Sequence, residues 1–316
     1  MLPSTSQHLI RSEWKGLWSW TRVLPGRRRL SDGKSGSSGT MKGLISLRHP
    51  VGRTALRGSL ADGSFCTIGD DDLVKLVAED FRPLLESFQQ AALPSPHPSP
   101  SLGHSPSEKV LNKNYPALNQ TLVSVLALRW ILAGEHDTFV GKGTDSETDL
   151  AFASFHRLRN VFLGCLRRLD IYVLVTSVML GDLSRDPELG GHLAARSRLD
   201  IRDAANETIA QHLRAQGVSV VLNRLTSKQR QLILASIRLG FIVAFRATPC
   251  WDLDRAQLSL HQGETRELDL LYMTRMLQLA GAQGDQDWTC ARAMTHEIWQ
   301  SCRVLYTVAR WQLVPR

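Results

Sequence analysis

The chain has 316 residues, 43% of them hydrophobic, and carries 38 Lys and Arg against 30 Asp and Glu. A chain of this length can bury a sizeable core without disulfides or a structural metal. Its five cysteines form no Cys-x-x-Cys pair, which argues against a disulfide-rich secreted fold and a cysteine-based zinc module. No stretch provides the about 20 consecutive apolar residues that a spanning helix requires. We therefore expect an intracellular protein, mitochondrial or cytoplasmic, with no transmembrane segment.

The positive charge is concentrated at the N-terminus. Residues 1–60 contain eleven basic and two acidic side chains, whereas the rest of the chain contains 27 basic and 28 acidic ones. A surface that binds nucleic acid should belong to the folded body, so we expect no nucleic-acid partner. Residues 1–60 instead predict a basic, mostly disordered arm.

Part of this arm has the pattern of an amphipathic basic helix. Apolar or neutral residues recur at helical spacing, and Arg27, Arg28 and Arg29 with a Ser/Gly-rich run follow them. Together these features resemble a mitochondrial presequence. Three alternatives remain open: a disordered arm, a nuclear-import cluster, and an upstream extension before a true start at Met41. The residues of the helical pattern are Ile10, Trp14, Leu17, Thr21 and Leu24.

Two further segments precede the main domain. Residues 61–92 predict a short helical appendage, because Asp70, Asp71 and Asp72 stand before an apolar periodic stretch and acids favour a first helical turn. Residues 93–107 predict a linker, since five prolines alternate with serines there and this composition does not bury enough apolar surface to order itself.

Residues 108–316 predict an all-α domain, a bundle of about eight helices around one core. Pro116 opens a helix that Gly134 closes, and its apolar residues cover most of its circumference, so this helix should be central. The only short strand candidate is Val218–Leu222. Further helices are predicted after a capping box at Ser146–Asp149, over Ile171–Leu183, from Asp186, from Asp200, over Thr226–Phe245, over Glu264–Ala280, and from Asp285 or Asp287 onward.

Two carboxylates fall on apolar helix faces. Asp182 follows Val175 and Val178 by seven and four residues, and Asp269 lies among leucines. A buried charge requires a partner. His156 lies partly inside its own helix. A structural role is the alternative for all three. Asp182 would pair with an arginine or lie at a frayed helix end, Asp269 would be solvated or paired with an arginine, and His156 would form a hydrogen bond between helices.

The order of these residues resembles the HD-domain phosphohydrolase superfamily, in the segment Phe155–Leu158, in Gly181-Asp182 and in Asp269. The resemblance implies an all-helical fold and a divalent metal held by a His, an adjacent His-Asp pair and a distant Asp. Position by position, His156, Asp182 and Asp269 correspond to three of the four ligands. Gly181 stands where the His of the pair would be, which implies a degenerate or re-purposed site. The chain also resembles uncharacterised fungal helical proteins, which imply no reaction.

Three functions follow. The first is a binding or interaction module for an unidentified protein, with a relic metal site. The second is a degenerate HD-like metal-dependent phosphohydrolase, in which Asp182 and His156 hold a cation that activates water against a phosphoester. The third is a small-molecule-binding protein of a biosynthetic pathway, with its pocket between helices. A divalent metal is implied only by the second, and the sequence predicts no other cofactor and no catalytic residue.

Overall fold

The computed structural model describes residues 54–85, 94–96, 102–141, 149–167, 169–180, 219–242 and 265–313, with the backbone alone at 219, 238–242 and 311–313. The chain divides into two compact units, Met1–Thr40 and Met41–Arg316, and every described residue lies in the second. The predicted presequence, the alternative start at Met41 and the helices expected from Asp186 and Asp200 lie outside the described residues.

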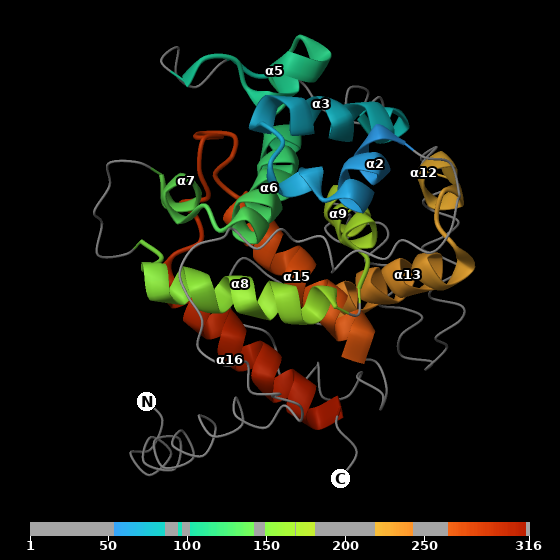
Figure 1. Ribbon diagram of the computed structural model, residues 1–316, viewed down its shortest axis with the longest axis vertical. Helices are drawn as coiled ribbons and strands as arrows, with labels where there is room; N and C mark the ends of the chain where they lie inside the picture. Colours follow the sequence, from blue (N-terminus) through green and yellow to red (C-terminus); the bar gives the residue numbers. More distant parts are fainter. Residues whose placement is uncertain are drawn as a thin grey trace, which may run out of the picture. The chain divides into compact units, whose positions relative to one another are not determined.

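The described residues form helices and turns, with no strand among them (Figure 1). Eight of these helices have seven or more residues, which confirms the predicted all-α bundle of about eight helices. The elements are α2 (Ala55–Asp62), η2 (Ser64–Cys66), α3 (Asp70–Asp80), α5 (Pro106–Leu111), α6 (Pro116–Ala133), α7 (His136–Val140), α8 (Phe152–Leu166), α9 (Ile171–Met179), α12 (Ser219–Asn223), α13 (Ser227–Ile242), α15 (Thr265–Ala280) and α16 (His296–Leu313).

Helix α6 is central, as its sequence predicts. Pro116 occupies its first turn, where the missing N–H costs nothing. Gly134 ends it in the left-handed conformation (φ 83°) that glycine adopts without strain. From Leu118 to Leu132 nearly every side chain is buried. The elements packed against α6 are η2, α3, α5, α7, α8, α9 and α15.

The apolar character of α6 is explained by this burial. By length and composition alone it is the one helix in the described ranges that could cross a membrane, but 78% of that window is buried within the protein. A central helix of a bundle and a spanning helix have the same composition, because both lack a solvent-facing side.

Residues 54–85 share the core of the main domain. The buried side chains of α2 and α3, among them Leu56, Leu73 and Val77, join one hydrophobic cluster with those of α6, α9 and α15. The end of the predicted arm and the described part of the predicted appendage therefore contribute to the same core as residues 108–316. Residues of the predicted linker also contact the main domain. Ser95 donates its N–H to the Asn114 carbonyl (2.9 Å), and the Pro96 carbonyl accepts from the Asn114 side-chain amide (2.9 Å).

Helix α15 packs against α6, α8, α9, α13 and α16, and its end lies very close to α6. A Cβ added at Gly281 would stand 2.3 Å from both the Gln120 carbonyl oxygen and Ser124 Oγ. At Gly284 it would stand 2.8 Å from Val123 Cβ. Glycine is therefore needed at both positions to permit this backbone approach.

Two predicted elements were wrong. The strand was expected over Val218–Leu222, of which Val218 lies outside the described residues and the rest falls in α12. There Val221 and Leu222 are buried while Val220 is exposed, a pattern that one helical turn produces. The last helix begins at His296 rather than at Asp285 or Asp287. The Asp287 carboxylate accepts hydrogen bonds from the N–H (2.9 Å) and hydroxyl (2.6 Å) of Thr289, so it stabilises a turn and does not cap a helix.

Candidate functional site

The first predicted site residue, His156, lies on α8 and is half-buried. Its ring meets the Phe152 ring edge-on, with 4.4 Å between centroids and an interplanar angle of 80°. Phe155, also on α8, lies 6.3 Å away by the same measure. These ring contacts are within a single helix, and Phe152 itself is 60% exposed, so His156 stands at the edge of the core.

The second predicted site residue, Asp269, is fully buried on α15. Its Oδ1 accepts a short hydrogen bond from the Tyr306 hydroxyl of α16. Its Oδ2 has no hydrogen-bond partner among the described residues. The same hydroxyl lies 3.5 Å from Cys165 Sγ of α8, and Arg310 Nη1 donates to it at 3.3 Å. Helices α8, α15 and α16 therefore meet at the Asp269 carboxylate. Its partner is the phenol of Tyr306 and not the arginine that the structural alternative predicted.

A second phenol completes this group, which we call the Asp269 cluster (Asp269, Tyr306, Tyr272 and Cys165). Tyr272 stacks on Tyr306 with 4.1 Å between ring centroids, and no residue that the structure describes forms a hydrogen bond with its hydroxyl. Burial raises the pKa of both tyrosines, since a phenolate would lose its hydration. Both phenols are therefore protonated at neutral pH, and that of Tyr306 serves as the donor to Asp269.

The cluster does not by itself fit a divalent metal. In the part of the chain that the structure describes, no group of three or more His, Cys, Asp or Glu side chains could hold such an ion. Asp182 lies outside the described residues, so the predicted set of His156, Asp182 and Asp269 stays a prediction. Metal analysis of protein purified with manganese, iron and zinc offered decides it: equally low content in wild type and Asp182→Ala would exclude the site.

A second group of charges joins α3 to α12. Arg224 Nη1 lies 2.6 Å from Oδ1 of Asp80, whose side chain is 1% exposed, and Thr54 donates to the other carboxylate oxygen at 3.0 Å. Burial raises the pKa of Asp80 and outweighs the opposing effects of Thr54 and Arg224. The chain positions of Asp80 and Arg224 differ by 144 residues, so no local sequence signal indicates this pair.

The same region is fixed by further contacts. Arg57 of α2 donates to the Arg224 carbonyl (2.6 Å) and lies over the Tyr172 ring, 4.1 Å from its centroid. Asp170 caps α9 through the Tyr172 N–H (2.8 Å) and accepts from Gln229 of α13 (3.1 Å). We call Asp80, Asp170, Arg57 and Arg224 the charged junction. It holds α2, α3, α9, α12 and α13 together, which is a structural role.

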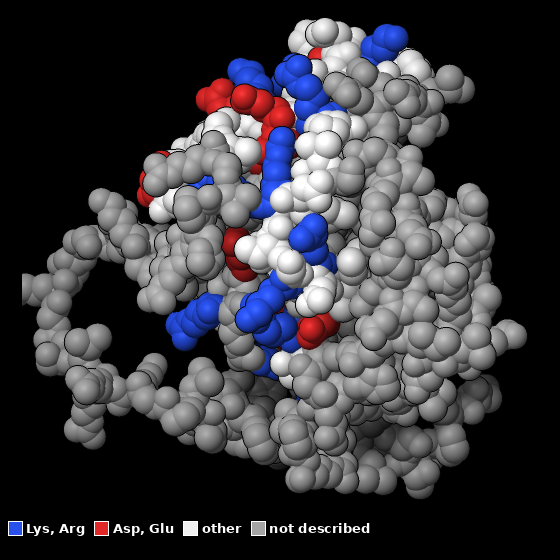
Figure 2. All heavy atoms as spheres, turned by 90° about the vertical axis from the view of Figure 1, so that its right-hand side faces the viewer, with Lys and Arg blue, Asp and Glu red and all other residues white. Residues whose placement is uncertain are grey.

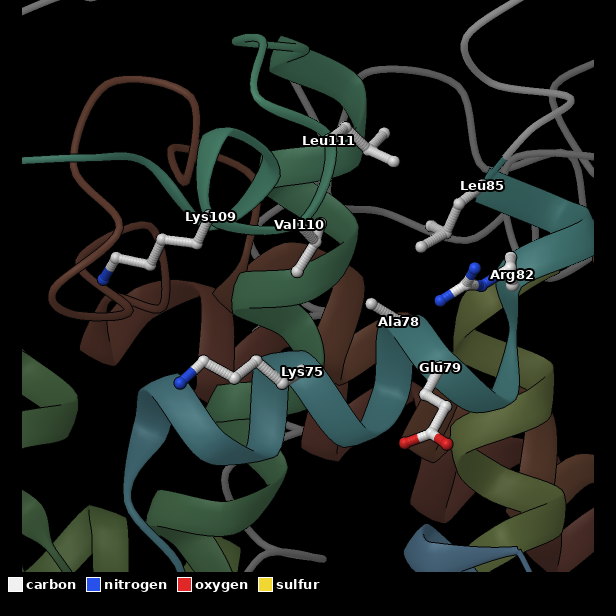
Figure 3. A pocket seen from close by; sticks show the side chains of 8 residues that line it. All are labelled: Lys75, Ala78, Glu79, Arg82, Leu85, Lys109, Val110 and Leu111. Carbon is white, nitrogen blue, oxygen red and sulfur yellow. The ribbon is translucent and has the colours of Figure 1, made fainter.

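A groove lies between α3 and α5, with a volume of about 420 Å³. Figure 3 shows Lys75 and Lys109 extending toward one end of it and Arg82 and Glu79 at the other. Between these ends the lining is apolar, and among the described residues three of its four side chains are only partly buried. The apolar lining residues are Ala78, Leu85, Val110 and Leu111.

The lysines of the groove have acidic neighbours. Lys109 Nζ lies 2.6 Å from Asp71 Oδ1, and Lys75 Nζ lies 3.4 Å from Asp72 Oδ1. The side chains of Lys75 and Asp72 are 64% and 68% exposed, and exposed pairs of this kind contribute little to stability. The Lys75 ammonium can therefore exchange its partner for the carboxylate of a ligand at low cost.

The sequence was compared with those of known families and proteins. A family of unknown function, DUF6829, matches residues 74–313. The chain belongs to this family. The DUF6829 match begins within α3 and ends at the last residue of α16, so it includes every residue that lines the groove and the whole Asp269 cluster. No curated protein and no solved structure matches the chain.

Proposed function

We propose that this DUF6829 protein is a binding module whose α3–α5 groove holds a short segment of a partner protein. The observation that carries the proposal is the lining of the groove, in which the partly buried apolar side chains of Ala78, Val110 and Leu111 lie between charged ends. Open apolar surface rimmed by polar groups is typical of interaction sites. An enclosed pocket would favour a small molecule, because such sites bury most of the ligand surface.

The lining specifies the partner segment. One or two apolar side chains would pack on Ala78 and Val110, which are only partly buried in the free protein. An acidic residue on one side would face Lys75 and Lys109. A helical segment supplies this arrangement when its apolar residues are three or four positions apart, the usual pattern of helix-in-groove recognition.

The test begins with peptides of about 12 residues selected from a random display library on the purified full chain. Selected peptides are then measured by fluorescence polarisation against Ala78→Trp, in which the new side chain fills the groove. Ala61→Trp is the matched control, since Ala61 is an exposed alanine on α2 away from the groove. We expect Ala78→Trp to weaken binding at least about tenfold and Ala61→Trp to leave it unchanged.

A second measurement guards against misfolding of Ala78→Trp. A photo-crosslinking residue in the selected peptide should attach to α3 or α5 of the wild-type protein, as read by mass spectrometry. Crosslinks elsewhere, equal affinity for both tryptophan variants, or a library that yields no binder would each refute the proposal.

A further inference from the structure

Helices α12 and α13 carry basic residues and no acidic ones. Over residues 219–242 the sequence contains Arg224, Lys228, Arg230 and Arg238 but neither Asp nor Glu. This contrasts with the rest of the chain beyond residue 60, where acids and bases nearly balance. Figure 2, which faces the side of the molecule where α12 and α13 lie in Figure 1, shows basic side chains recurring along the strip of described atoms, with acidic side chains among them.

The described acidic neighbours of this region make contacts within the protein. Asp80 is 1% exposed, Asp170 is partly buried, and both carboxylates accept hydrogen bonds from described residues. The Arg224 side chain is 31% exposed. Among the described side chains of residues 220–237, the charges that reach the surface are therefore basic.

Three cations on this surface are available to a partner, and two of them are already oriented. Arg224 is held by Asp80, which accepts from its Nη1 through both the carboxylate (2.6 Å) and the backbone carbonyl (2.5 Å). The Arg230 guanidinium is oriented by two long hydrogen bonds, from Nη1 to Asn223 Oδ1 (3.5 Å) and from Nη2 to Ser227 Oγ (3.4 Å). Lys228 is exposed and forms no ion pair with any described residue. Side chains held in place lose less entropy when they bind.

We propose that Arg224, Lys228 and Arg230 form a docking surface, the α12–α13 face, for an acidic segment of a partner protein. The three cations lie close together in the sequence, at positions 224, 228 and 230, and match a segment with a few neighbouring carboxylates, to which a guanidinium can present a planar pair of donors. The proposal does not depend on the groove between α3 and α5.

Two other classes of partner fit the face less well. An anionic membrane would be met by several exposed apolar side chains, whereas Val220, 49% exposed, is the one exposed large apolar residue that the structure describes on α12 and α13. A nucleic-acid-binding protein is expected to have an excess of positive charge on its folded body. Residues 61–316 carry 27 basic and 28 acidic side chains, so this excess is absent from their sequence.

The test measures fluorescence anisotropy of a labelled peptide of about 12 residues, with five glutamates around a central leucine, on the full chain. The same peptide with Gln at each Glu serves as the uncharged probe. We expect binding of the Glu peptide alone, weakening when sodium chloride is raised from about 50 mM to about 300 mM. The double charge reversal Lys228→Glu with Arg230→Glu should weaken it at least about tenfold.

The matched control is Lys113→Glu with Arg167→Glu, which changes the net charge equally at two exposed positions outside α12 and α13. Equal weakening by both double variants would overturn the proposal, because the effect would then be one of total charge. Absence of Glu-peptide binding up to about 1 mM would overturn it too. Binding of phosphatidylserine vesicles or duplex DNA that depends on Lys228 and Arg230, with the peptide unbound, would assign the face to another partner.

Discussion

Replacement of Gly281 by alanine should be among the most damaging single changes in the described part of the chain. The added Cβ would lie 2.3 Å from the Gln120 carbonyl oxygen and from Ser124 Oγ, whereas ordinary contact begins at 3.4 Å. The shortfall is at least 1.1 Å. Neither obstacle can yield, because one is backbone of α6 and the other is a hydroxyl that donates to that same carbonyl at 2.8 Å.

The ends of α15 and α6 must therefore separate, and contacts along both helices are lost. Overpacking of this kind costs about 1–3 kcal/mol, and we expect the upper end, about 3 kcal/mol, for a backbone obstacle. This is a large share of the about 5–15 kcal/mol that stabilises a typical domain. Unfolding in urea, followed by circular dichroism at 222 nm, measures the difference as a shift of the midpoint at constant slope.

Gly164 provides the matched control. It is exposed within α8, and an added Cβ there meets nothing within 4 Å. Gly164→Ala should stabilise the protein by up to about 1 kcal/mol, because alanine is the better helix former. The reasoning would be refuted by a Gly281→Ala variant within about 1 kcal/mol of wild type, or by equal losses in both variants.

Three further outcomes can be checked by the same unfolding assay. Tyr306→Phe should cost about 2 kcal/mol, because Asp269 loses its donor while remaining buried, and an unchanged midpoint would show that water replaces the hydroxyl. Arg129→Met should cost about 2 kcal/mol, since it removes the bidentate partner of Glu135 (2.9 and 2.8 Å), and a gain in stability would contradict this. Burial raises the pKa of Asp80 above 3.8, so its carboxyl binds the proton more tightly in the folded than in the unfolded protein. The free energy of unfolding of wild type, relative to Asp80→Asn, should therefore fall as the pH rises from below 3.8 through the raised pKa. A difference between the two proteins that does not depend on pH would refute the shift.

Local signals in the sequence were enough to predict most of the fold. Pro116 and Gly134 delimit α6 because each acts through its own backbone, without help from distant residues. Thr226 and Gln229 likewise cap α13 through mutual hydrogen bonds (2.9 and 3.3 Å) three residues apart. The late start of α16 could not be predicted in this way. An aspartate such as Asp287 can either cap a helix or stabilise a turn, and here its carboxylate accepts from the Thr289 N–H and stabilises a turn.

The candidate sites were predicted only in part, for a related reason. The apolar sequence around Asp269 indicated that this residue is buried. Its partner Tyr306 lies on another helix, and the only signal for Tyr306 in the sequence is its position on the buried face of α16. The charged junction depends on Asp80 and Arg224, which meet only after the chain has folded. The groove likewise exists only once α3 and α5 lie side by side.

The position of α6 also has a consequence for the dynamics of the protein. Its backbone amides between Leu122 and Leu132 are shielded by neighbouring elements as well as by their own helical hydrogen bonds. Local fraying, which exposes amides at helix ends, cannot reach them without separating several neighbours at once. In deuterated solvent these amides should exchange last, at a rate limited by opening of the entire bundle, so α6 reports the global stability of the protein.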